Sequence, residues 1–161
     1  MNEGNRERAR ASTAPVGKRS DERAGSGERG RAAERLVRDF LVERGLAPLA
    51  ENWRRRLGEL DLVMRERASG TIVFVEVRYR RRGGGLASVE RRKRARLLRG
   101  ARAWLQRHAG PDCAARIDVV GVGPPPTRAD EIDPDGAAGP TTALREGLWL
   151  EWVVNAVEDD G

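Results

Sequence analysis

Hydrophobic residues recur along the chain with two different spacings, and these spacings predict where helices and strands lie. Residues 31–44 place apolar side chains on one face of a helix that ends at Gly45. Shorter runs rich in Val, Ile and Leu are typical of strands. The spacings predict two helices and four strands in the order α-β-β-β-α-β, over residues 31–44, 46–56, 58–66, 71–80, 88–108 and 116–122.

The position of the second helix in that order predicts the sheet topology. The helix over residues 88–108, with Ser88 as its N-cap, separates two strands and so forms the crossover that joins parallel neighbours. The first three strands follow one another closely and are expected to pair antiparallel. We therefore predict an α/β (α+β) fold in which a mixed central sheet is flanked by helices.

Composition changes at both ends of this core. Residues 1–30 mix Arg, Glu, Ser and Gly with almost no large apolar side chain, which predicts a disordered basic tail. Residues 123–147 are rich in Pro, Gly and Asp and are expected to form a disordered insertion. Residues 148–157 are expected to form a short strand and then one or two helical turns. Residues 31–161 therefore make one predicted domain.

The hairpin over residues 58–80 carries charged side chains where a buried strand normally has aliphatic ones. Successive side chains of a strand point to opposite faces, so Glu59 shares a face with Asp61. By the same alternation, Glu76 shares a face with Arg78. These four residues are the candidates for chemistry in the hairpin.

A four-residue loop between the two strands would pair Glu66 with Thr71 and place Asp61 opposite Glu76. Like charges directly opposite each other destabilise a strand pair. A cation between the two carboxylates would remove that cost, and carboxylate oxygens are the ligands that Mg²⁺ prefers. The pattern therefore predicts a metal site on the hairpin.

The same pattern also fits a hairpin with one solvated face, on which the acids are ordinary surface residues. However, residues 72–75 and Val77 are apolar on both faces. This favours a central strand that is covered on both sides. A covered strand makes the metal site the preferred interpretation.

Glu34 lies at the edge of the apolar face of the first helix. One interpretation is a surface pair with Arg38, four residues later, which would contribute about 0.3–0.5 kcal/mol. The other is a carboxylate that leans over the edge of the core toward the sheet. The helical spacing supports both interpretations equally.

Basic side chains dominate the outer faces of the helix over residues 88–108. Eight basic residues stand against one acid, Glu90, so ion pairs cannot neutralise them and their repulsion costs stability. Phosphates would relieve this repulsion, which favours nucleic-acid contact over a merely solvated face. The residues expected to contact nucleic acid are Arg80, Arg81, Arg82, Arg91, Arg92, Lys93 and Arg96.

The overall charge supports a polyanionic partner. The formal net charge is +6, but residues 31–122 hold 22 basic and 11 acidic side chains, whereas residues 123–161 hold 2 and 9. The single cysteine, Cys113, excludes an intramolecular disulfide, which fits a reducing compartment. No apolar run approaches the roughly 20 residues of a membrane span. We expect a cytoplasmic protein without a membrane partner.

Several motifs within the predicted order resemble one known family. They are Glu34, Asn52-Trp53-Arg54, Gly58-Glu59-Leu60-Asp61-Leu62, Val73-Phe74-Val75-Glu76-Val77-Arg78, Arg92-Lys93 and Arg116-Ile117-Asp118-Val119-Val120. They resemble the YraN-like family of uncharacterised bacterial proteins. That family is similar to the archaeal Holliday-junction resolvases, which have a restriction-endonuclease-like core. The resemblance implies a nuclease signature of the form Asp…Glu-x-Lys.

The resemblance implies metal-assisted hydrolysis of a phosphodiester bond. Asp61, Glu76 and the carbonyl oxygen of Val77 would hold Mg²⁺ or Mn²⁺. Glu34 would reach the metal directly or through water. The partner is expected to be DNA, branched or duplex, rather than RNA, and recognised by its structure or charge. A homodimer is a candidate assembly. The catalytic candidates are Asp61, Glu76 and Arg78, with Glu59 and Tyr79 in support.

Arg78 departs from the signature, because active nucleases generally carry lysine there. Arginine stays protonated, so Arg78 can clamp a phosphate but cannot act as a base. Lys93 on the next helix is a candidate to take the place of the lysine. This departure leaves a non-catalytic nucleic-acid-binding module as the main alternative function. A third alternative is a protein-interaction domain that uses the acidic C-terminal third.

Overall fold

The computed structural model describes the backbone of residues 18–56, 58–79, 91–110, 112–125 and 141–157. Within these ranges, the side chains of residues 18–26, 91 and 141–144 lie outside the description. The elements of the described residues are α1 (Lys18–Val42), β1 (Leu46–Arg55), β2 (Gly58–Glu66), β3 (Ile72–Tyr79), α2 (Arg91–His108), β4 (Ala115–Gly123), β5 (Thr141–Arg145) and β6 (Leu148–Val153).

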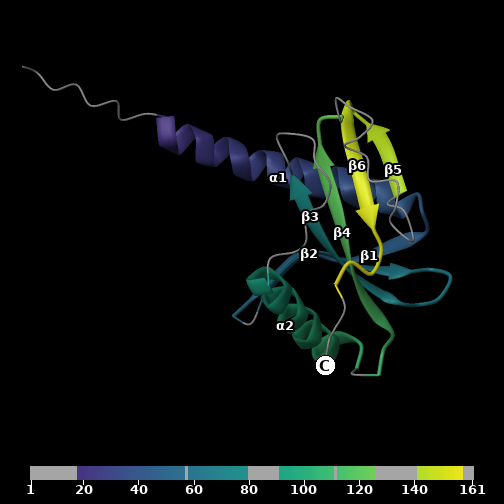
Figure 1. Ribbon diagram of the computed structural model, residues 1–161. Coiled ribbons are helices and arrows are strands. Elements are labelled where there is room, and N and C mark those ends of the chain that lie inside the picture. The colour runs from purple at the N-terminus through teal and green to yellow at the C-terminus, as the bar shows by residue number, and fades with distance from the viewer. Residues whose placement is uncertain (1–17, 57, 80–90, 111, 126–140, 158–161) are drawn as a thin grey trace, which may run out of the picture.

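The described strands form one mixed sheet in the order β1-β2-β3-β4-β6-β5 (Figure 1). β1, β2 and β3 are antiparallel neighbours, and α2 carries the chain from β3 to its parallel neighbour β4. β6 and β5 extend the sheet with antiparallel pairing. The predicted α/β class and the order α-β-β-β-α-β are confirmed, and two further strands complete the sheet. The arrangement is consistent with a nuclease-like core.

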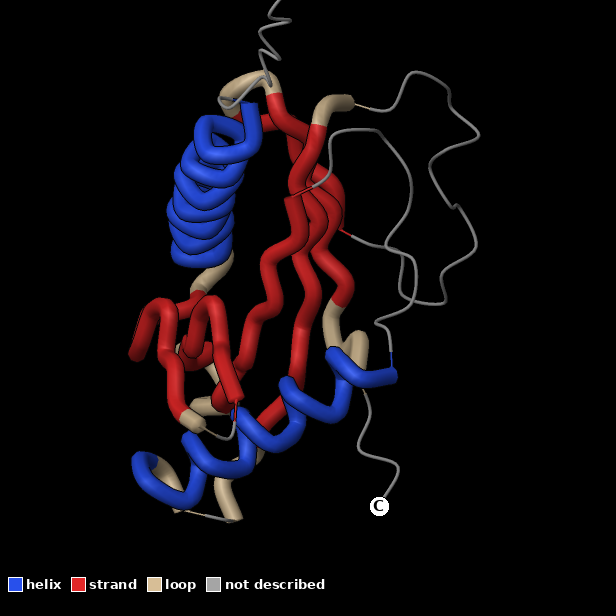
Figure 2. The backbone as a smooth tube through the Cα atoms, turned by 90° about the vertical axis from the view of Figure 1, so that its left-hand side faces the viewer, coloured by secondary structure: helices blue, strands red, loops and turns tan. Residues whose placement is uncertain are grey.

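The two helices cover opposite faces of the sheet (Figure 2). Met64 and Val73 belong to the hydrophobic cluster that contains α1. Their neighbours Val63 and Phe74 belong to the cluster that contains α2. Because side chains alternate along a strand, this division places α1 on one face and α2 on the other. β2 and β3 are therefore covered on both sides, which confirms the prediction made for β3.

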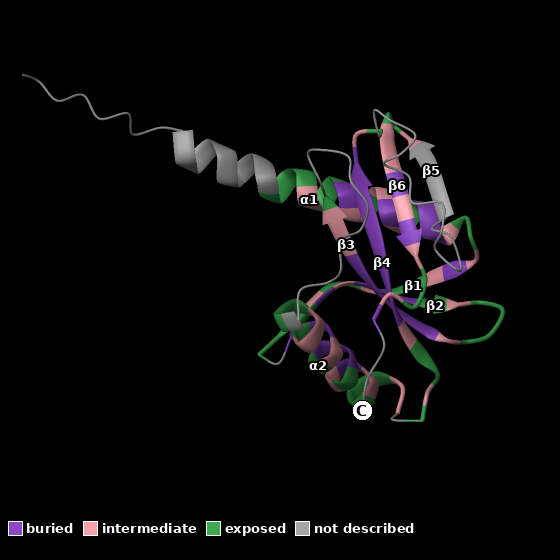
Figure 3. Ribbon diagram, viewed as in Figure 1, coloured by how far each residue is buried: buried purple, intermediate pink, exposed green. Residues whose placement is uncertain are grey.

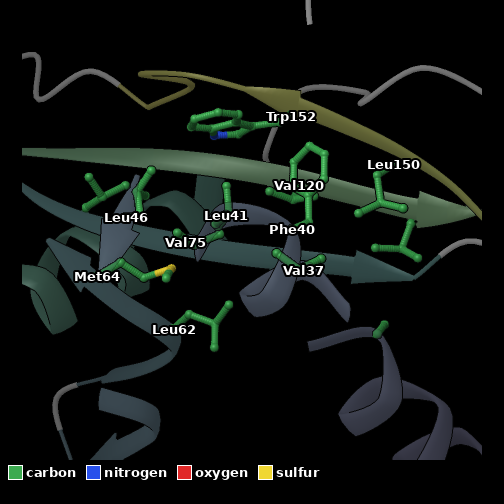
Figure 4. Close-up of a cluster of buried hydrophobic side chains, with 13 residues drawn as sticks. Val37, Phe40, Leu41, Leu46, Leu62, Met64, Val75, Val120, Leu150 and Trp152 are labelled. Carbon is green, nitrogen blue, oxygen red and sulfur yellow. The ribbon is translucent and has the colours of Figure 1, made fainter. Parts of the chain in front are cut away.

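The cluster on the α1 face is largely aliphatic and extends across the sheet to β6 (Figure 4). Phe40 of α1 and Trp152 of β6 meet edge to face, with their ring centroids 6.2 Å apart. β4 runs through the middle of the sheet and is buried along most of its length (Figure 3). None of the described helices is both long enough and apolar enough to cross a membrane.

The first helix begins earlier than the sequence predicted. α1 starts at Lys18, so the last part of the predicted disordered tail is helical instead, while residues 1–17 lie outside the described residues. Arg and Glu favour helices even without an apolar face, and periodicity could not detect this part. A Cβ on Gly27 or Gly30 would meet nothing within 4 Å, so neither glycine is required there for packing.

The C-terminal part also differs from the prediction. Residues 141–145 form β5 within the predicted insertion 123–147, of which residues 126–140 lie outside the described residues. Glu146 and Gly147, with φ of 49° and 74°, form the tight turn that joins β5 to β6. After β6 the chain forms a turn rather than the predicted helical turns, and the Ala156 N–H donates to the Ile117 carbonyl at 2.8 Å.

Candidate functional site

The hairpin of β2 and β3 has the predicted register. The Glu66 N–H donates to the Thr71 carbonyl at 2.9 Å, and the paired positions continue as far as Leu62 and Val75. Beyond that pair, a side chain replaces the backbone pairing: the Oδ2 of Asp61 accepts a hydrogen bond from the Val77 N–H at 2.9 Å. The Asp61 side chain therefore binds the backbone of β3 at Val77, next to Glu76.

Asp61 lies in a place that opposes its ionisation. Burial, followed by the charges of Glu76 and Glu34, raises the pKa of the Asp61 carboxyl to about 7. The hydrogen bond from the Val77 N–H and the charge of Lys93 act in the opposite direction. The charges of two glutamates and one lysine thus influence the ionisation of Asp61.

Glu76 is a buried acid in the middle of this group, with its side chain 5% exposed. Its Oε1 forms an ion pair with the Nζ of Lys93, whose side chain is 46% exposed. Apart from this ion pair, the same Oε1 has no hydrogen-bond partner among the residues that the structure describes. A buried carboxylate oxygen is costly unless a cation compensates its charge. Lys93 of α2 is thus the cation that the structure brings to Glu76.

Glu34 turns away from its own helix surface. Its Oε2 accepts a hydrogen bond from the Nδ2 of Asn52 at 2.7 Å, whereas Arg38 forms ion pairs with Asp39 and Glu51. Of the two interpretations that the spacing left open, the structure favours the carboxylate that leans toward the sheet. Asn52 itself has a φ of 49°, a left-handed conformation that Asn tolerates better than most residues.

The residues of this group are suited to a divalent cation. Asp61 and Glu76 offer hard carboxylate oxygens, and the buried Oε1 of Glu76 has spare capacity to accept a ligand bond. Within the described part of the chain, no set of three or more His, Cys, Asp or Glu side chains is close enough to hold an ion. The structure brings Asp61 close enough to Glu76 for their charges to interact, while Glu34 is bound to Asn52.

The remaining predicted catalytic and supporting residues lie close by in the fold. Arg78 follows Glu76 by two positions on β3 and is half-buried. Tyr79 ends β3 with an exposed side chain, and the exposed Glu59 lies near the start of β2. Arg96 on α2 forms an ion pair with Glu59 at 3.3 Å. Arg80, Arg81, Arg82 and the side chain of Arg91 lie outside the described residues.

A pocket of about 280 Å³ opens between β2, β3 and the first turns of α2. It contains both members of the Glu76–Lys93 ion pair. We call it the carboxylate pocket; its lining residues are Glu59, Glu76, Arg92, Lys93, Arg96 and Leu97. The structure thus brings three of the predicted nucleic-acid-binding residues to one pocket with a predicted metal ligand.

Sequence reasoning missed the role of Asn52. The residue was noticed as part of a motif, but nothing in the local pattern indicates which side chain it binds. Its partner Glu34 lies eighteen positions away on another element. The signal that could have found it is a single Asn within an otherwise regular strand pattern, since Asn often marks a left-handed residue.

Sequence reasoning quoted Asp118 in a motif but missed the role of this fully buried acid on β4. Its carboxylate accepts hydrogen bonds from the Nε of Arg116 at 3.1 Å, the Nε1 of Trp152 at 3.0 Å and the N–H of Asn155 at 2.9 Å. Burial raises the pKa of the Asp118 carboxyl, and these donors act in the opposite direction. With its charge and lone pairs satisfied by its own donors, Asp118 is a structural residue.

Comparison with known proteins gives a consistent result. A model of the uncharacterised protein family UPF0102 matches residues 33–122. A UPF0102 protein of Halorhodospira halophila is 50% identical over 110 residues, which cover 66% of this chain and 84% of the relative. One of Methylococcus capsulatus is 45% identical over 132 residues, covering 80% and 89%. One of Pseudomonas paraeruginosa is 45% identical over 119 residues, covering 69% and 94%.

Proposed function

The chain belongs to the uncharacterised protein family UPF0102, and we propose that it is a metal-dependent endonuclease that hydrolyses phosphodiester bonds in DNA. The observation that carries the proposal is the enforced proximity of Asp61 and Glu76 beside a buried strand pair, with the pKa of Asp61 raised to about 7. Acids held together at such a cost are typical of functional sites.

Asp61 and Glu76 are the residues that would hold Mg²⁺ or Mn²⁺, with Glu34 as the neighbouring carboxylate. A divalent cation bound there supplies positive charge that lowers the pKa of a water molecule and stabilises charge on a phosphate. Arg78 stays protonated and would clamp the scissile phosphate. Lys93 would compensate the charge of Glu76, and its half-exposed side chain would also contact a phosphate.

The proposed substrate is DNA, branched or duplex. Arginine and lysine side chains line the carboxylate pocket, and such side chains contact the phosphate backbone without reading sequence. We therefore propose recognition by charge and structure. Arg78 favours one alternative, a nucleic-acid-binding module that has the site but does not cut, because arginine cannot accept the proton that lysine can.

A cleavage assay separates these functions. Purified protein is incubated with branched, duplex and single-stranded DNA in Mn²⁺, next to Asp61→Asn and a matched control, Asp39→Asn, which changes an exposed acid on α1. We expect products with the wild type and with Asp39→Asn, and a loss of about 100-fold or more with Asp61→Asn. Salt-dependent binding without products in any of the three proteins would contradict hydrolysis and support the binding module.

A further inference from the structure

A second pocket lies beside the turn between β1 and β2, where the turn faces α2. Its volume is about 180 Å³, and arginine dominates its lining. We call it the arginine pocket; its charged lining residues are Arg54, Arg55 and Arg56 from β1 and the turn, Arg96 and Arg99 from α2, and Glu59 from β2. Of these arginines, only Arg96 was among the residues predicted to contact nucleic acid.

Close backbone contact holds the two sides of the arginine pocket in place. A Cβ on Gly58 would lie 2.8 Å from the Cα of Gly100 and 2.9 Å from the carbonyl oxygen of Arg96. Any side chain at Gly58 would therefore push β2 away from α2. The contact positions the arginines of the turn opposite those of the helix, so the pocket is built by the backbone rather than by flexible side chains alone.

The charge of the arginine pocket is not balanced by its own lining. Glu59 is the one acid among the lining residues, and it pairs with Arg96 at 3.3 Å while both side chains remain about half exposed. Arg55 donates through Nη1 to the carbonyl oxygen of Arg54 at 3.0 Å, which orients its guanidinium without neutralising it. A concave site with this excess of guanidinium groups suits a phosphate, which arginine binds bidentately.

The arginine pocket adjoins the carboxylate pocket. Glu59 and Arg96 line both of them. The carboxylate pocket also contains Glu76, one of the proposed metal ligands. A chain of phosphates that passes Glu76 can therefore continue over Arg96 into the arginine pocket.

We infer that the arginine pocket binds a backbone phosphate of the nucleic acid next to the phosphate that is cut. The inference rests on the proposed function, because it assigns the path of the substrate away from the same site. The pocket holds the strand by charge and so contributes to affinity without sequence preference. It also identifies the turn between β1 and β2 as part of the nucleic-acid interface.

Binding of labelled DNA, measured by fluorescence anisotropy in EDTA over a range of salt concentrations, tests the pocket without cleavage. The test variant is Arg55→Gln/Arg99→Gln. The matched control is Arg65→Gln/Arg67→Gln, which removes two exposed arginines at and just beyond the opposite end of β2. We expect the slope of log K against log salt to become shallower by about 1 to 2 in the test variant and by less in the control.

A variant that should strengthen DNA binding gives a second test. Glu59→Gln removes the acid of the arginine pocket, so we expect tighter binding and a steeper salt slope. Equal salt slopes for the wild type and Arg55→Gln/Arg99→Gln would overturn the inference that the pocket binds a phosphate, even if DNA is cut in Mn²⁺. A shallower salt slope in that variant but not in the control, with no cleavage by the wild type, would support phosphate binding in the pocket and contradict hydrolysis. No binding of DNA by the wild type would overturn both.

Discussion

At Asp61, the ionised side chain is favoured by one interaction and opposed by another. Its Oδ2 accepts the hydrogen bond from the Val77 N–H and so connects β2 to β3 beyond their last paired residues. Ionisation strengthens that bond but brings negative charge next to Glu76 and Glu34 in a buried place. A nearby cation offsets this repulsion, and Lys93 supplies one positive charge through its ion pair with Glu76.

The raised pKa of Asp61 makes a prediction about stability. An acid whose pKa is higher in the folded than in the unfolded state binds more protons when folded, so its contribution to stability is complete below about pH 4 and is lost as the pH rises through about 7. Asn resembles the protonated acid. Without divalent cations, we expect Asp61→Asn to match the wild type near pH 4 and to be more stable by about 1–3 kcal/mol at pH 8.

Urea unfolding at the two pH values, in EDTA, measures this difference. Addition of Mn²⁺ at pH 8 should raise the melting temperature of the wild type and leave that of Asp61→Asn unchanged, since the ion stabilises the state that binds it. A variant that is less stable than the wild type at pH 8 would show that the ionised carboxylate of Asp61 stabilises the fold, contrary to this account.

At the scale of elements, the contact between β2 and α2 positions both pockets. Gly58 and Gly100 allow the start of the strand to approach the backbone of the helix. The same helix carries Lys93 to Glu76 and Arg96 to Glu59. A change in the distance between strand and helix would therefore affect the ion pairs and the arginine pocket together.

Two alanine substitutions test this contact, because their surroundings differ. A Cβ on Gly58 would meet only backbone atoms at 2.8–2.9 Å, so strand or helix must move. A Cβ on Gly100 would meet the Cδ2 of Leu60 at 3.3 Å, and a leucine side chain can adjust. We expect Gly58→Ala to lower the free energy of unfolding by about 1–3 kcal/mol. Gly100→Ala should change it by less than about 1 kcal/mol, because alanine favours the helix.

Chemical denaturation of the two variants and the wild type measures this difference. The arginine pocket supplies a second readout, since Gly58→Ala should also weaken DNA binding at low salt. Equal stability of the two variants would show that the strand and the helix are not held in close contact at Gly58.

At the scale of the whole molecule, a buried network connects the sheet from its hairpin to its last residues. Arg116 of β4 donates to Glu66 at the end of β2 at 3.2 Å and to Asp118 at 3.1 Å. Asp118 then accepts from Trp152 of β6 and from the N–H of Asn155. Trp152 packs against Phe40, so the network also supports the core under α1. It stabilises a part of the fold outside the proposed site.

Removal of the buried acid should therefore destabilise the entire fold. We expect Asp118→Ala to lower the free energy of unfolding by about 3–5 kcal/mol, because it leaves the guanidinium of Arg116 and the indole N–H of Trp152 without their buried partner. Glu66→Ala removes the solvent-facing end of the same network and should cost about 1 kcal/mol or less. Urea unfolding of both variants measures the difference, and similar costs would contradict a structural role that is centred on Asp118.

Much of this protein could be predicted from its sequence alone, because the informative patterns are local. Alternation along a strand and the length of one loop determined the register that brings Asp61 to Glu76. Helical spacing and short apolar runs determined the order of the core elements. The same patterns failed at α1 before residue 31 and at β5, where the chain is helical or extended without a clear apolar periodicity.

Tertiary structure alone decided which distant residues meet. The sequence could not choose a partner for Glu34, and the packing of α1 against β1 selected Asn52. It named Lys93 as a candidate, and the position of α2 on the sheet brought that lysine to Glu76. The arginine pocket is bounded by β2 and α2, which approach each other closely at Gly58 and Gly100. Such contacts depend on how helices pack on a sheet, and the residue spacing within one element does not determine that packing.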